Sequence, residues 1–202
     1  MVIKPKGLKR LCKEAWRDNT LTIVRMEPDG LAVSGGYWLF YAKELSRMKK
    51  EAKAAIIELA GDIPEIGVGK RIGKEVEKTL GATGIEPMQE ILDATETATY
   101  RHRRAKITIH ENDGLECYYS VESHNIACID PYIQEMITID EMSAAAEKDN
   151  DPVRLYFEDD DSIFVVYTKR VLEESLVGQM LKDMRQMVYN MERHEGRIKD
   201  AE

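Results

Sequence analysis

The sequence lacks the features of a secreted, membrane-spanning or disulfide-stabilised protein. Its 202 residues include three cysteines, and no two of them form a Cys-x-x-Cys pair. Because so few, widely spaced cysteines are typical of reduced proteins, we expect Cys12, Cys117 and Cys128 to be small buried thiols. No apolar run approaches the roughly 20 residues that span a bilayer, and the first residues have no apolar signal-peptide core. The sequence therefore predicts a cytoplasmic protein without membrane contact.

Motifs for nucleotide binding, metal binding and catalysis are also missing. The glycine-rich stretch 67–74 does not match a P-loop, because Glu75 stands where Ser or Thr should follow the lysine. The histidines lack zinc-site spacing, and the carboxylates of 158–161 are typical of a polar turn rather than a cation site. No GxSxG element occurs. We therefore expect no cofactor, no metal and no enzymatic activity, with a site built from scattered carboxylates as a weaker alternative.

Charge is distributed unevenly along the chain. Residues 1–110 hold 20 Lys and Arg against 15 Asp and Glu, whereas residues 111–202 hold 9 against 22. The first part thus carries a charge of +5 and the second −13, for a total of −8. Such asymmetry can mark a basic nucleic-acid surface on an acidic body, but taken alone it favours ordinary surface variation with an acidic tail.

Hydrophobic periodicity predicts an α+β protein. Apolar residues recur with a period near 3.6 residues in the expected helices and with a period of two residues in the expected strands. We expect helices over 5–17, 42–59, 86–95, 131–139 and 171–191, and strands over 21–26, 31–34, 37–41, 124–129, 153–157 and 163–167. The glycine-rich stretch 61–84 is predicted to be a linker or mobile loop with a short helix at 74–80.

The clearest local signal lies in residues 107–118. Ile107, Ile109, Leu115 and Cys117 alternate around Asp113-Gly114. Alternating apolar residues that flank Asp-Gly predict a β-hairpin.

This hairpin has an earlier counterpart, which indicates an internal repeat. Ile3-Lys4-Pro5 and Ile85-Glu86-Pro87 each open a predicted helix, at an offset of 82 residues. The Asp-Gly turns at 29–30 and 113–114 are offset by 84 residues. Two matches at nearly one offset suggest duplication.

With this order of elements the sequence resembles the DNA sliding-clamp family of polymerase processivity factors. Residues 125–133 resemble the entry to the family's helix, and 151–157 with 163–167 resemble its closing strand pair. The resemblance covers roughly residues 1–60 and 85–170. It implies two duplicated helix-plus-antiparallel-sheet units in a small clamp-like protein, of a phage-type accessory kind.

The resemblance also implies a DNA-contacting surface, because clamps direct basic helices towards phosphates without reading sequence. The candidate DNA-binding residues are Lys6, Lys9, Arg10, Lys13, Arg47, Lys50, Lys53, Arg101, Arg103 and Arg104. Ordinary solvated helix surface is the competing interpretation.

The predicted C-terminal helix has no counterpart in the clamp repeat. Its apolar seam is spaced three, four, three and four residues, which keeps the seam on one side of a helix. The seam residues are Val177, Met180, Met184, Met187 and Met191. Because methionine suits partner surfaces, we expect a homo-oligomer, most simply a dimer, with this helix at the interface. Packing on the parent domain is the other interpretation.

The sequence thus divides into a first unit at 1–60, a linker at 61–84, a second unit at 85–170 and a C-terminal helix and tail at 171–202. The leading hypothesis is a non-enzymatic, clamp-like protein that associates with duplex DNA in replication or in a mobile element. The alternative is a protein-interaction or assembly module without DNA contact.

Overall fold

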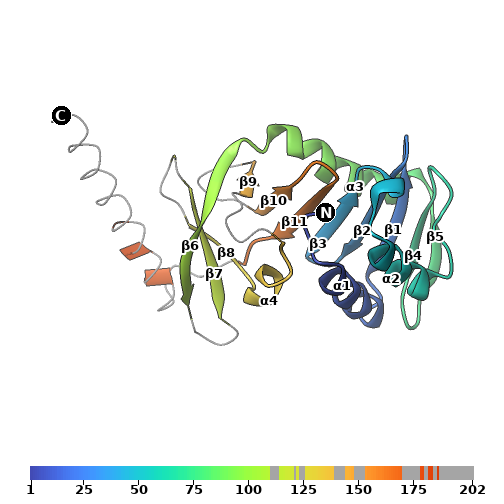
Figure 1. Ribbon diagram of the computed structural model, residues 1–202, viewed down its shortest axis with the longest axis horizontal. Helices are drawn as coiled ribbons and strands as arrows, with labels where there is room; N and C mark the ends of the chain where they lie inside the picture. Colours follow the sequence, from blue (N-terminus) through green and yellow to red (C-terminus); the bar gives the residue numbers. More distant parts are fainter. Residues whose placement is uncertain are drawn as a thin grey trace.

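The computed structural model describes residues 1–109, 114–120, 122, 126–138, 144–147 and 153–169, together with residues 178, 179, 182, 183 and 186. These residues build a mixed structure of helices and antiparallel strands, which confirms the α+β class (Figure 1).

One continuous sheet connects the described parts of the chain. Its strands are β1 (Leu21–Met26), β2 (Gly30–Gly35), β3 (Trp38–Ala42), β4 (Gly69–Ile72), β5 (Glu77–Leu80), β6 (Tyr100–Ile109), β7 (Leu115–Ser120), β8 (Ile126–Ile129), β9 (Ala144–Ala146), β10 (Arg154–Glu158) and β11 (Ser162–Tyr167). They lie in the order β5-β4-β1-β2-β3-β11-β10-β9-β6-β7-β8, and each neighbouring pair is antiparallel.

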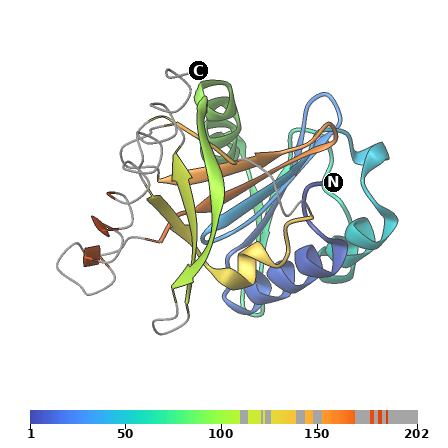
Figure 2. The ribbon, with the colours of Figure 1, turned by 60° about the vertical axis from the view of Figure 1, so that its left-hand side comes forward.

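Helices cover both faces of this sheet. They are α1 (Pro5–Arg17), α2 (Lys50–Ala60), α3 (Ala82–Asp93) and the one-turn α4 (Pro131–Gln134), with 3-10 turns at Leu45–Arg47 and Ala94–Thr97. α1 and α2 pack against one face, in the larger apolar cluster. α3 packs against the opposite face, in a second cluster, and Figure 2 shows it across the sheet from α1.

The two halves of the chain meet at the pairing of β3 with β11. Phe40 lies opposite Phe164 in this pairing, and both side chains are fully buried beneath α1 and α2. On the other face, Leu39 lies opposite Val165, in the cluster that contains α3. Since successive side chains of a strand point to opposite faces, these central strands are apolar on both sides.

Several elements form where the sequence predicts them. α1 and β1 have the predicted bounds, and Pro5 stands at the start of α1, where its missing N–H is harmless. β6 and β7 form the predicted hairpin, with Ile109 opposite Leu115. The turn residues 110–113 lie outside the described part of the chain.

Other predicted bounds are wrong. The helix expected over 42–59 begins only at Lys50, because Met48 and Lys49 have extended backbones. Residues 61–84 are not an irregular linker, and the helix expected at 74–80 is absent. β4 and β5 form a hairpin there, and β4 pairs with β1.

The second half contains further corrections. α3 starts at Ala82 and keeps Pro87 inside the helix, whereas Pro87 was expected to open it. α4 ends at Gln134, well before residue 139, because the chain then turns so that Ile137 bridges to Ile3. β9 was not predicted.

The predicted helix 171–191 falls almost entirely outside the described residues, and all five residues of the interface seam lie outside them. Among the helices that the structure describes, none is long and apolar enough to cross a membrane.

Candidate functional site

The side chains of α1 divide into a buried and a basic side. Leu8, Leu11, Cys12 and Ala15 are buried against the sheet. The basic residues of α1 recur at three- and four-residue spacing, which places them on the solvent side. α2 lies beside α1 and buries Ala52, Ala55 and Ile56 in the same layer. Seven of the ten predicted DNA-binding residues come from α1, α2 and the turn before α2, and they lie on this side of the sheet.

Two lysines of α1 are held by a carboxylate of α2. Lys9 Nζ lies 2.5 Å from Glu58 Oε2, and Lys13 Nζ lies 3.6 Å from Glu58 Oε1. The hydrogen bond from Lys9 and the charges of both lysines lower the pKa of Glu58. The carboxylate therefore stays ionised and neutralises part of the positive charge.

Two arginines on the same side are also engaged. The Arg10 guanidinium stacks 3.9 Å from the centre of the Tyr132 ring, and its Nε lies 3.4 Å from Glu14. Arg47 Nε lies 2.9 Å from Glu44, and its Nη1 lies 3.6 Å from Asp161. Both arginines stay more than half exposed.

Three lysines complete this side. Lys6 and Lys50 are exposed and Lys53 is half-buried, and none of the three forms an ion pair with another described residue. They are therefore cations of this surface that a polyanion meets without first displacing a described carboxylate.

The three arginines of β6 lie elsewhere. Arg101 is opposite Ala145 and Arg103 is opposite Tyr119, so both point to the sheet face that carries α3. Arg104 points to the other face, where its Nη2 lies 3.1 Å from the buried Glu116. The structure therefore does not gather the ten predicted residues into one patch.

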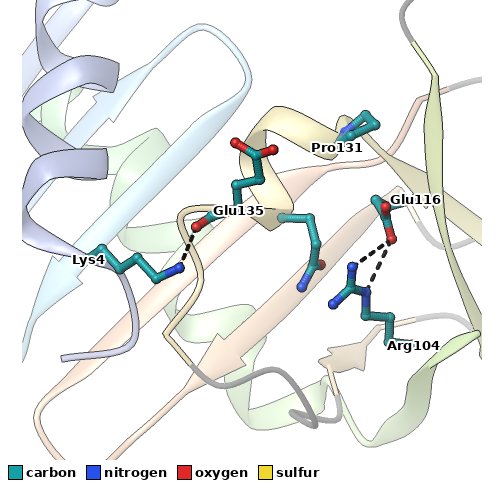
Figure 3. A pocket seen from close by; sticks show the side chains of 6 residues that line it. Lys4, Arg104, Glu116, Pro131 and Glu135 are labelled. Atoms are coloured by element: carbon teal, nitrogen blue, oxygen red, sulfur yellow. Dashed lines mark hydrogen bonds and ion pairs between the residues drawn. The ribbon is translucent and has the colours of Figure 1, made fainter. Parts of the chain in front are cut away.

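Arg104 lines a polar pocket of about 480 Å³ near the start of α1 (Figure 3). Its other lining residues are Lys4, Glu116, Pro131, Gln134 and Glu135. Lys4 Nζ donates to the carbonyl oxygen of Glu135 at 2.8 Å, and the buried Gln134 accepts a hydrogen bond from Tyr118 Oη. Asp130 caps α4 by accepting from Tyr132 N at 3.0 Å, which fixes the helix that forms one wall.

The described lining of the pocket supplies hydrogen-bonding and charged groups. Its lining joins a lysine and an arginine with two glutamates and an amide. No cluster of three or more His, Cys, Asp or Glu with metal-binding geometry occurs among the described residues. The pocket is therefore suited to holding a small polar group.

Sequence reasoning missed this pocket because it depends on distant pairings. Lys4 reaches the pocket because Lys4 N donates to Met136 O at 2.8 Å, beside the bridge between Ile3 and Ile137. No local pattern in the sequence signals a contact between residues so far apart.

In the acidic turn between β10 and β11, groups of the protein itself engage the Asp159 carboxylate. Asp159 Oδ1 accepts from Asp161 N, Ser162 N and Ser162 Oγ at 3.0, 2.7 and 2.9 Å. Asp159 Oδ2 lies 2.7 Å from the amino group of Met1. These partners fit the predicted polar turn.

Comparison of the chain with known protein families, with curated proteins and with solved structures finds no match.

Proposed function

We propose that this protein is a non-enzymatic, clamp-like protein of the reducing cytoplasm that associates with duplex DNA without reading its sequence. Its role would be that of an accessory to DNA replication or to a mobile element. In this proposal residues 1–60 and 85–170 are duplicated units, joined through β3 and β11. Three free, buried cysteines support the cytoplasmic setting.

The observation that carries the proposal is the packing of α1 beside α2. It places Lys6, Lys50 and Lys53 on one side of a rigid sheet, together with Arg10 and the other basic residues of these helices. Lysines that no described carboxylate neutralises are suited to phosphate contacts, which position DNA but carry no sequence information.

Salt-dependent DNA binding tests the proposal. We expect the wild-type protein to bind a mixed-sequence duplex at about 50 mM salt, with log affinity falling by about 0.9 per phosphate neutralised for each unit of log salt. Lys6→Glu with Lys53→Glu should abolish binding while the circular dichroism spectrum stays unchanged. The matched control, Lys74→Glu with Lys78→Glu, reverses the same charge near and on β5 and should retain most of the binding.

Two results would remove the proposal: no binding by the wild-type protein at low salt, or equal loss in both double variants. Arg101→Glu with Arg103→Glu then measures any contribution from the opposite face of the sheet. A large loss in that variant alone would move the DNA site to the face that carries α3.

We propose as the alternative an assembly module without DNA contact, in which the methionine seam of residues 171–191 joins two copies of the chain. Residues 178, 179, 182, 183 and 186 are helical, which supports a helix in this segment. Sedimentation of the wild-type protein and of Met184→Glu over a wide concentration range tests this alternative, since the variant should shift any dimer to monomer.

A further inference from the structure

A third apolar cluster lies on β6, β7 and β8. Leu115, Cys117, Ile126 and Cys128 form it, with Ala105 and Tyr119 packed against it. We call it the Cys117–Cys128 cluster, because these residues are directly opposite in the pairing of β7 with β8 and their Sγ atoms are 3.9 Å apart. Its side chains point away from the sheet face that carries Tyr118, Ala127 and Ile129.

The residues of this cluster are buried, although the described helices pack elsewhere. Cys117 is 0% exposed and Cys128 is 2% exposed. No residue of a described helix belongs to the cluster, since α3 packs with β1, β2, β3, β10 and β11. Figure 1 shows β6, β7 and β8 at the opposite end of the sheet from α2. An apolar sheet face of this kind needs a cover from another segment.

The described chain reaches the edge of this cluster just before its C-terminal segment begins. Lys169 N donates to Cys128 O at 2.7 Å, and Lys169 Nζ lies 3.0 Å from Asp130 Oδ2. The last described residue before the C-terminal segment therefore lies beside β8, the strand that carries Cys128.

The segment that follows has the two-sided character of a covering helix. Gln179, Lys182, Asp183 and Gln186 are helical and exposed, and their spacing of three, one and three places them on one face. Met180, Met184 and Met187 have the same kind of spacing in the sequence, and in a continuous helix they would fall on another side. Methionine adapts its shape readily, which suits it to an irregular surface of sulfur and branched side chains.

We propose that residues 171–191 dock on the Cys117–Cys128 cluster of their own chain, with Met180, Met184 and Met187 against β7 and β8. The anchored position of Lys169 favours the chain's own segment over that of a second copy. Docking closes the sheet at its β8 end and shields the paired thiols from solvent and oxidants. The proposal is independent of DNA binding, because the cluster lies on the other side of the sheet from α1 and α2.

Thiol alkylation of the full-length protein tests the docking. N-ethylmaleimide should modify Cys117 and Cys128 slowly in the wild-type protein and about tenfold faster in Met184→Glu, as expected when local opening controls access. Gln179→Glu, on the exposed face, is the matched control and should leave the rates unchanged. Cys12 is the internal control, since it is buried on the side of α1 that faces the sheet and burial raises its pKa to about 12.

Unchanged rates at Cys117 and Cys128 in Met184→Glu would overturn the proposal. A simultaneous rise in the alkylation rate of Cys12 would mean general unfolding of the variant. In that case, NMR of the wild-type protein tests the docking. Nuclear Overhauser effects are expected between methionine methyls of the segment and the methyls of Leu115 and Ile126 within one chain. Their absence overturns the docking, and so does their appearance between separately labelled chains, which would assign the cover to a second copy.

Discussion

At the scale of single residues, Asp159 shows how one carboxylate organises a turn. Burial would raise its pKa, but hydrogen bonds from the Met1 amino group and from Ser162 outweigh this effect and hold the pKa below its ordinary value. Met1 and Val2 are thereby fastened to the β10–β11 turn, since Val2 N also donates to Ser162 Oγ at 2.8 Å.

We expect Asp159→Asn to lower the free energy of unfolding at pH 7 by about 1–3 kcal/mol, because charge-assisted hydrogen bonds are lost. A carboxyl group with a depressed pKa stabilises the folded state above its unfolded pKa of about 3.9, and this contribution disappears as the pH falls through the folded value. Urea unfolding should therefore show a difference at pH 7 that shrinks near pH 3. Asp160→Asn, at the exposed neighbour, is the control, and an equal loss at both pH values would contradict the explanation.

At the scale of elements, the contact between α1 and α2 includes ion pairs between partly exposed side chains. Glu58 binds Lys9 and Lys13 and so removes two cations from the basic side of the sheet. The three groups are about half exposed, so we expect the ion pairs to contribute little to stability.

Glu58→Gln should therefore strengthen duplex DNA binding while leaving the thermal midpoint nearly unchanged. Two lysines become available to phosphates, so the salt dependence should steepen by up to about two units of slope. Fluorescence anisotropy across a salt series measures both quantities. Glu65→Gln, at an exposed position outside α1 and α2, is the control, and weaker binding by Glu58→Gln would contradict the assigned surface.

At the scale of the whole molecule, the pairing of β3 with β11 makes the two halves one structure. The larger apolar cluster includes residues of α1 and α2 as well as Tyr118, Leu155 and Phe164. A core shared in this way predicts that residues 1–60 and 85–170 unfold together.

Urea unfolding monitored at both ends of the molecule tests this prediction. Fluorescence of Trp16 and Trp38 reports on the first half, and thiol exposure at Cys117 and Cys128 reports on the second. We expect coincident midpoints in the wild-type protein and in Phe164→Ala, with the variant less stable by about 3–5 kcal/mol. Val153→Ala, at an exposed site, is the control. Separate midpoints would show that the halves fold independently.

The sequence by itself determined the class of structure and many of its elements. Pro5 and the apolar stripe of Leu8, Leu11 and Ala15 define α1, because these local features act within one helical repeat. Alternation around Asp113-Gly114 likewise predicts the β6–β7 hairpin. The candidate basic residues of α1 and α2 could also be identified, because charged residues on an amphipathic helix lie opposite its buried side.

Only the tertiary structure decided what those elements pack against. The stretch 61–84 has weak local preferences, and it forms strands because β4 pairs with β1. Gly73, which directly follows β4, permits a close approach to the backbone of Asn19, since an added Cβ would lie 2.5 Å from Asn19 Cα. Long-range pairing of this kind is invisible to periodicity.

Long-range strand pairing also explains why the predicted basic residues do not form one site and why the pocket was not predicted. Strand register, set across the sheet, sends Arg101 and Arg103 to one face and Arg104 to Glu116 on the other. The bridge between Ile3 and Ile137 carries Lys4 to the pocket beside α4. Local sequence specifies which residues are basic or apolar, but only pairing between distant strands decides which of them share a surface.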